Sequence, residues 1–145
     1  MKIGIATDHN GVEEKKVIIN YLKEIGYEVV DYSTNNTPID DYPDFAFAVS
    51  EGIVNKDIDL GILMCGTGIG MSIAANKIKG IRCGKVSSVE EARLTRAHND
   101  ANVMALSYKE SIDKLIEMVK MFVETPFAND ERHVRRINKI IEKEG

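Results

Sequence analysis

Short apolar runs alternate along this chain with segments that repeat apolar residues at helical spacing. Five such runs are rich in β-branched or apolar residues and mostly lack polar alternation, as buried strands do; they cover residues 2–7, 28–32, 60–64, 81–86 and 102–106. Strands that alternate with helices form parallel sheets covered by helices on both faces. The pattern therefore predicts an α/β fold of three α/β/α layers, with a mostly parallel five-stranded sheet of Rossmann-like architecture.

The segments between these runs are expected to be helices. They are marked by apolar periodicity and by end signals such as Gly26, Pro43, Ser88 and Ser111, and they cover residues 12–25, 43–55, the stretch after Ser88, 112–124 and 130–143. A chain of 145 residues suits one domain of ordinary size. We expect a single domain over residues 1–145.

Composition narrows the classes of partner. The chain is 43% hydrophobic and 29% charged with a net charge of -4, so it can bury a core and has no field that would gather nucleic acid or an anionic membrane. No signal peptide or membrane-spanning stretch is found, and two cysteines are too few for a disulfide scaffold. We expect a cytosolic protein that binds a small molecule, not a nucleic acid or a membrane.

The strongest local signal is the glycine-rich loop that follows the third strand, Cys65-Gly66-Thr67-Gly68-Ile69-Gly70. Loops at the carboxyl ends of parallel strands are the usual ligand sites, and alternate glycines let backbone amides turn toward an anion. The loop matches neither the dinucleotide fingerprint nor the P-loop. It predicts an oxyanion or phosphate site, and a tight turn without ligand is the alternative.

Three other side chains are candidates for chemistry. Cys65 stands before the glycine turn, where helix amides favour the thiolate, so it is either a base or nucleophile or a small buried hydrophobe; the second reading suits Cys83. His9 and His98 follow a strand and end a helix, and each could be a general acid or base, a phosphate ligand or a hydrogen-bonded structural group. Zinc-type spacing is absent, so a metal ligand is the weakest choice.

Arg132 and Arg136 lie four residues apart and therefore share one face of the last helix. Two guanidinium groups so placed could clamp a phosphate. The alternative is that they form an ordinary solvated face of an amphipathic helix.

These motifs together resemble the type B ribose-5-phosphate isomerases, and the resemblance covers nearly the whole chain. It rests on Thr7-Asp8-His9, Asp41-Tyr42-Pro43, the glycine-rich loop, Ala74-Ala75-Asn76-Lys77, Ile81-Arg82, His98-Asn99-Asp100-Ala101-Asn102 and Arg132-His133. The wider family also holds isomerases of allose and galactose 6-phosphates. The resemblance implies a metal-free, cofactor-free aldose–ketose isomerase, dimeric or tetrameric, whose sites are completed across a subunit interface.

The resemblance also implies residue roles. Cys65 matches the base that moves a proton between carbons 1 and 2, and His98, with Asp8 nearby, matches the acid and base that open the sugar ring. The enediolate pocket is implied for Thr67 and the amides of Gly66, Gly68, Ile69 and Gly70. Contacts to the rest of the substrate are implied for Tyr42 and Asn99, and contacts to its phosphate for His9, Arg132 and Arg136.

Two positions distinguish this chain within the family. Cys65 together with Met71 selects the branch that uses a cysteine base, because other members place a Glu at the position of Met71. Lys109 stands where the family has a phosphate-contacting Arg, and Lys cannot fork onto two oxygens. The alternatives are therefore a hexose 6-phosphate isomerase, a catalytically silent phosphosugar-binding module and, from another class, a flavodoxin-like nucleotide binder.

Overall fold

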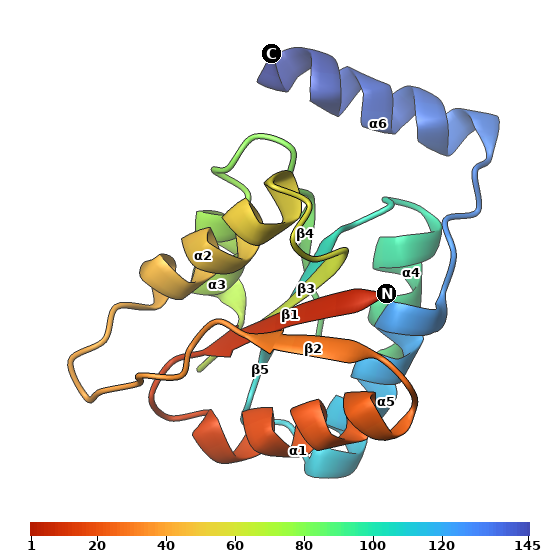
Figure 1. Ribbon diagram of the computed structural model, residues 1–145. Helices are drawn as coiled ribbons and strands as arrows, with labels where there is room; N and C mark the ends of the chain where they lie inside the picture. The colour runs from red at the N-terminus through yellow and green to blue at the C-terminus, as the bar shows by residue number, and fades with distance from the viewer.

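Strands and helices alternate along the chain in the computed structural model, which describes residues 1–145 (Figure 1). The elements are β1 (Lys2–Thr7), α1 (Val12–Glu24), β2 (Glu28–Asp31), α2 (Tyr42–Val54), β3 (Leu60–Cys65), α3 (Ile69–Ala75), β4 (Cys83–Lys85), α4 (Val89–Ala97), β5 (Val103–Ser107), α5 (Ile112–Glu124) and α6 (Glu131–Glu144). No helix is both long and apolar enough to cross a membrane.

All five strands are parallel and lie in the order β2-β1-β3-β5-β4, which confirms the predicted sheet. The central strands β1, β3 and β5 are buried almost throughout, as expected. The expectation of burial is wrong for β2 and β4, whose residues are half-buried or exposed. Both are edge strands, so each has a neighbour on one side only.

The fourth strand is also shorter than residues 81–86, its predicted extent. The N–H of Arg82 donates to the side-chain oxygen of Asn102 at 2.9 Å instead of joining the ladder, and regular pairing begins at Cys83. A side chain has therefore replaced the neighbouring strand as partner at this end of β4.

Helices cover both faces of the sheet, giving the expected three layers. One core lies under α1, α4 and α5 and contains Ile18, Ala92 and Phe122, and the other lies under α2 and α3 and contains Val49 and Met71. The predicted helix caps are present: Ser88 Oγ accepts the Glu91 N–H at 3.0 Å, and Ser111 Oγ accepts the Lys114 N–H at 3.2 Å.

The last helix, α6, stands apart from the three layers and is joined to α5 by an extended segment (Figure 1). Its inner face buries His133 and Ile137, and its end contacts the turn before β4, where Glu144 accepts the N–H of Gly80. Arg132 and Arg136 are exposed on its outer surface, as the spacing predicted.

Candidate active site

Three loops meet where the central strands end. The register pairs Thr7 with Met64 and Cys65 with Ser107, so the carboxyl ends of β1, β3 and β5 lie in line. Each of these strands is followed by a polar or glycine-rich turn. This edge of the sheet gathers most of the predicted site residues: Asp8, His9, Tyr42, Cys65, Gly66, Thr67, Gly68, Ile69, Gly70 and Lys109.

The glycine-rich loop has a backbone shape that depends on Gly68. Gly68 has φ of 80°, and a Cβ there would lie 2.9 Å from the Cα of Leu106. Only glycine combines this left-handed backbone with so close an approach to the neighbouring strand. The loop then enters α3, with the Ile69 N–H donating to Thr67 Oγ1 at 3.1 Å.

Cys65 faces this loop from the end of β3. The Gly68 N–H points at its Sγ at a distance of 3.2 Å, and the residue is 7% exposed. The amides of Gly66, Thr67 and Gly70 donate no hydrogen bond within the chain. A thiol group therefore lies beside three free amide donors, the arrangement needed to remove a proton and stabilise an oxyanion.

The turn after β1 brings a carboxylate and a tyrosine to the same edge. Asp8 Oδ1 accepts the Asn10 N–H at 3.0 Å. The ring of Tyr108, which follows β5, packs on Gly11, where a Cβ would lie 3.0 Å from Cδ2, and its hydroxyl would lie 3.7 Å from a Cβ at Gly66. Burial raises the pKa of Tyr108, and the charge of Asp8 raises it further, so this phenol keeps its proton.

His9 is held by the loop that connects β2 to α2. Its Nδ1 lies 3.2 Å from Asp40 Oδ1, and Asp40 Oδ2 accepts the Asn36 Nδ2–H at 3.0 Å and the Thr37 N–H at 3.2 Å. Asn36 Nδ2 also donates to the Thr7 carbonyl at 2.9 Å. This loop was predicted to be either a flexible connection or part of a site, and it packs against the end of β1.

Two more predicted residues border the glycine-rich loop. Tyr42, the first residue of α2, lies over α3, where a Cβ on Gly70 would be 2.6 Å from its ring. Lys109 is exposed, and its N–H donates to Ser107 Oγ, which itself donates to the Gly66 carbonyl. Ser107 thus ties the turn that carries Lys109 to the loop that carries the free amides.

The remaining predicted residues form a second cluster at the opposite edge. His98 ends α4, and its ring stacks on His133 of α6 with centroids 4.3 Å apart and planes 19° apart. Burial lowers the pKa of His133, and the charge of His98 lowers it further, so His133 is neutral near pH 7. Arg132 and Arg136 lie on the same helix.

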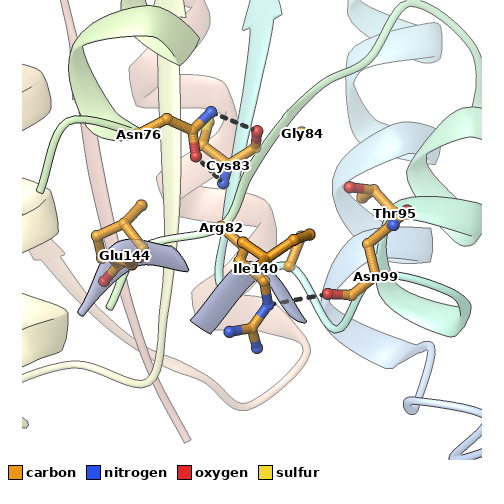
Figure 2. Close-up of a pocket in the computed structure, with 10 residues that line it drawn as sticks. Asn76, Arg82, Cys83, Gly84, Thr95, Asn99, Ile140 and Glu144 are labelled. Carbon is orange, nitrogen blue, oxygen red and sulfur yellow. Dashed lines mark hydrogen bonds between the residues drawn. The ribbon is translucent and has the colours of Figure 1, made fainter. Parts of the chain in front are cut away.

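A cavity of about 470 Å³ lies between α6 and the body, beside this cluster (Figure 2). Asn99 borders it, and the Asn99 carbonyl accepts the Arg82 Nε–H at 3.0 Å. Cys83 also borders it and is half-buried, not fully buried as predicted, because β4 is an edge strand. Burial nevertheless raises the pKa of Cys83 to about 12, so its thiol is unreactive at neutral pH.

The two clusters lie at opposite ends of the sheet. β5 begins next to the His98 cluster and ends beside Cys65, and its four steps from Val103 to Ser107 span roughly 13 Å. The expectation that Asp8 lies near His98 is therefore not met within one chain. No group of three or more His, Cys, Asp or Glu side chains is placed to hold a metal ion.

Comparison with known proteins gives this arrangement a family. A sequence model described as ribose/galactose isomerase matches residues 3–140. The chain belongs to this family. Among its curated relatives are a probable ribose-5-phosphate isomerase B of Mycoplasma genitalium, 46% identical over 98% of this chain and 95% of that protein, and the ribose-5-phosphate isomerase B of Mycobacterium leprae, 37% identical over 99% and 90%.

Solved structures of the ribose/galactose isomerase family share the whole fold. Clostridium thermocellum ribose-5-phosphate isomerase B superposes with a TM-score of 0.94 at 43% identity, covering 99% of this chain and 97% of that one. The Mycoplasma genitalium enzyme with bound ribulose-5-phosphate gives 0.92 at 45% identity, covering 99% and 95%. The expected resemblance and fold are thereby confirmed.

Three residues at the family site escaped the sequence reasoning. Asp40, Tyr108 and His133 contact predicted site residues only because a loop, a strand end and a distant helix fold onto them. The one available signal was position: Tyr108 immediately follows a predicted buried strand, and such loops are where ligands bind.

Proposed function

We propose that this chain interconverts ribose 5-phosphate and ribulose 5-phosphate by proton transfer through an enediolate. The observation that carries the proposal is the Cys65 sulfur beside the free amides of Gly66, Thr67 and Gly70. Relatives named as ribose-5-phosphate isomerases B, one of them solved with ribulose-5-phosphate, support this substrate.

In the proposed reaction the Cys65 thiolate removes the proton from carbon 2 of the open-chain aldose. The electron pair of that C–H bond forms the carbon 1–carbon 2 double bond, and the carbonyl electrons move to oxygen 1. The free amides and Thr67 stabilise the resulting enediolate. Cys65 then returns the proton to carbon 1, while a proton passes from oxygen 2 to oxygen 1, and the ketose forms.

His98 opens the furanose ring in this proposal, and Asn99 contacts the sugar. The phosphate is bound by His9, Lys109 and the two arginines Arg132 and Arg136. Because acid–base groups must lie within hydrogen-bond reach of the same substrate, one chain cannot supply both Cys65 and His98 across roughly 13 Å. Each site therefore takes its two halves from two subunits of a homo-oligomer, and our specific proposal is a dimer.

Exposed apolar side chains support the homo-oligomer. Ile69 and Ile73 lie one turn apart on α3, directly after the glycine-rich loop, and are 52% and 58% exposed. Ile140 and Ile141 on α6 are similarly exposed. A second copy that covered α3 with this part of α6 would bring its own His98 cluster toward Cys65. We place the enzyme in the cytosol, where its two free cysteines remain reduced.

The proposal is tested by isomerisation assays on ribose 5-phosphate, allose 6-phosphate and galactose 6-phosphate, with a chelator present. We expect the highest kcat/KM on ribose 5-phosphate and no loss with EDTA, because base and oxyanion donors already account for the proton transfer. A preference for a hexose phosphate would change the substrate, and loss of activity that one divalent metal restores would overturn metal independence. Absence of turnover with retained binding would leave a phosphosugar-binding module.

A further inference from the structure

We propose that Asp40 is a positioning residue, which fixes the His9 imidazole so that its Nε2 side is presented to the phosphate group of the substrate. The inference rests on the proposed function, and it adds a residue that acts through His9 without touching the substrate.

The carboxylate of Asp40 is itself fixed from two directions. Its Oδ2 accepts the side-chain N–H of Asn36 and the backbone N–H of Thr37, at 3.0 and 3.2 Å. Asn36 is anchored in turn by its bond to the carbonyl of Thr7, the last residue of β1. Asp40 is thereby held by the rigid strand that His9 follows.

The start of the same loop is anchored independently. Lys15 Nζ is 4% exposed as a residue and donates to the Ser33 carbonyl at 2.8 Å, and it pairs with Asp31 at 2.9 Å. Ser33 Oγ also accepts the Thr7 N–H at 3.1 Å. The loop therefore has contacts that keep its shape without any contribution from His9.

Charge and exposure assign the roles within the pair. The Asp40 side chain is 8% exposed and that of His9 is 34% exposed. Burial alone would raise the pKa of Asp40, but hydrogen bonds from Asn36, His9 and Thr37 outweigh it and lower that pKa. Asp40 is thus an ionised acceptor, and Nδ1 of His9 is the ring nitrogen that donates to it.

This leaves the second ring nitrogen available. Nε2 of His9 makes no hydrogen bond within the chain, and the ring stands half-exposed in the turn that also holds Asp8. A carboxylate at Nδ1 stabilises a ring that carries protons on both nitrogens, and such a ring donates Nε2–H to an anionic oxygen. A phosphate is the anionic part of the proposed substrate.

The test is a double-mutant cycle with Asp40→Asn and His9→Ala. Asn is nearly isosteric and can still accept from Asn36 and Thr37, so the loop should keep its shape. We expect Asp40→Asn to raise KM for ribose 5-phosphate, and the inhibition constant of inorganic phosphate, by roughly tenfold, with kcat within about twofold. In the His9→Ala background the same substitution should have no further effect.

Asp44→Asn is the matched control, since it makes the same charge change four residues away on an exposed side chain with no hydrogen-bond partner. It should leave KM and melting temperature unchanged. An unchanged KM in Asp40→Asn, or an equal rise in KM with and without His9, overturns the inference. A wild type that binds phosphate through the coupled pair but isomerises no sugar refutes the proposed function alone, and a wild type that binds no phosphate refutes both.

Discussion

Cys65 and Cys83 differ in what surrounds their sulfur atoms, and the difference predicts which thiol is chemically active. The Cys65 Sγ receives the Gly68 N–H, whereas burial raises the pKa of Cys83 to about 12. We expect iodoacetamide to inactivate the enzyme by alkylating Cys65 only, with protection by bound substrate. Mass spectrometry of the labelled peptides gives the site. Inactivation that persists in Cys65→Ala but disappears in Cys83→Ser would reverse this assignment.

Replacement of the base tests the chemistry itself. Cys65→Ala removes the proton acceptor and leaves the amide donors, so kcat should fall about 100- to 10,000-fold, as is typical when general base catalysis is lost. Affinity for a phosphorylated sugar should stay within about tenfold, because the group acts in the transition state. An active Cys65→Ala enzyme that still exchanges the carbon-bound hydrogen with solvent would require another base.

Tyr108 offers a neutral donor beside the reacting groups. Its hydroxyl stays protonated, because burial and the Asp8 charge raise its pKa. If it donates to the sugar, Tyr108→Phe should lower kcat/KM about 2- to 13-fold, the worth of one neutral hydrogen bond. Tyr27→Phe, at the opposite edge of the sheet, is the control for loss of a phenol. Equal kinetics in both variants would show that Tyr108 only packs.

At the scale of elements, α6 is the part whose packing should respond to pH. His133 packs under it against His98, and burial lowers the pKa of His133, so the packed form resists protonation more than the unfolded chain does. Its contribution to stability is therefore complete above the ordinary histidine pKa of about 6.5 and is lost as the pH falls below that value.

His133→Phe keeps an aromatic ring in the stack and removes the titration. We expect the melting temperature of the wild type to fall relative to this variant as the pH is lowered from about 7.5 to about 5.5. Thermal melts of both proteins in matched buffers measure the difference. Melting curves that stay parallel over this range would mean that His133 is not the group responsible.

Elements fixed by local chemistry were the ones that the sequence predicted best. The fifth helix was predicted at residues 112–124 and has those bounds, because Ser111 caps it and Pro126 follows closely. β4 was predicted too long, because its start depends on the side chain of Asn102, which lies far along the chain. Strand order could not be predicted, since it depends on which strands pair in the folded protein.

The candidate site divides in the same way. Asp8 and Cys65 could be placed together beforehand, because parallel strands bring their carboxyl ends to one edge. The contact of Asp40 with His9 could not, because a loop of polar residues has no periodicity from which its path can be read. Nor could the separation of Asp8 from His98 within one chain, because it follows from the direction in which α4 runs beside the sheet.

At the scale of the whole molecule, the two clusters predict complementation between defective subunits. Neither Cys65→Ala nor His98→Asn should be active alone on ribose 5-phosphate. After the two chains are unfolded together and refolded in equal amounts, half of the dimers are mixed and each has one intact site of two. We therefore expect about a quarter of the wild-type activity.

The control is the double variant Cys65→Ala/His98→Asn mixed with wild type. In its mixed dimers each of the two sites lacks one group, so only the wild-type dimers, about a quarter of the total, should be active. If Cys65 and His98 instead acted within one chain, this mixture would keep half of the wild-type activity, and the first mixture would recover none.

The length of sheet between Cys65 and His98 also ties the catalytic rate to protein concentration. An isolated subunit holds half of each of two sites and completes neither, so turnover would require association first. Specific activity would then fall when the enzyme is diluted below the dissociation constant of the dimer, and assays begun from dilute stocks would show a lag while subunits reassemble. The cellular abundance of the chain would accordingly set not only how much enzyme there is but what fraction of it can work.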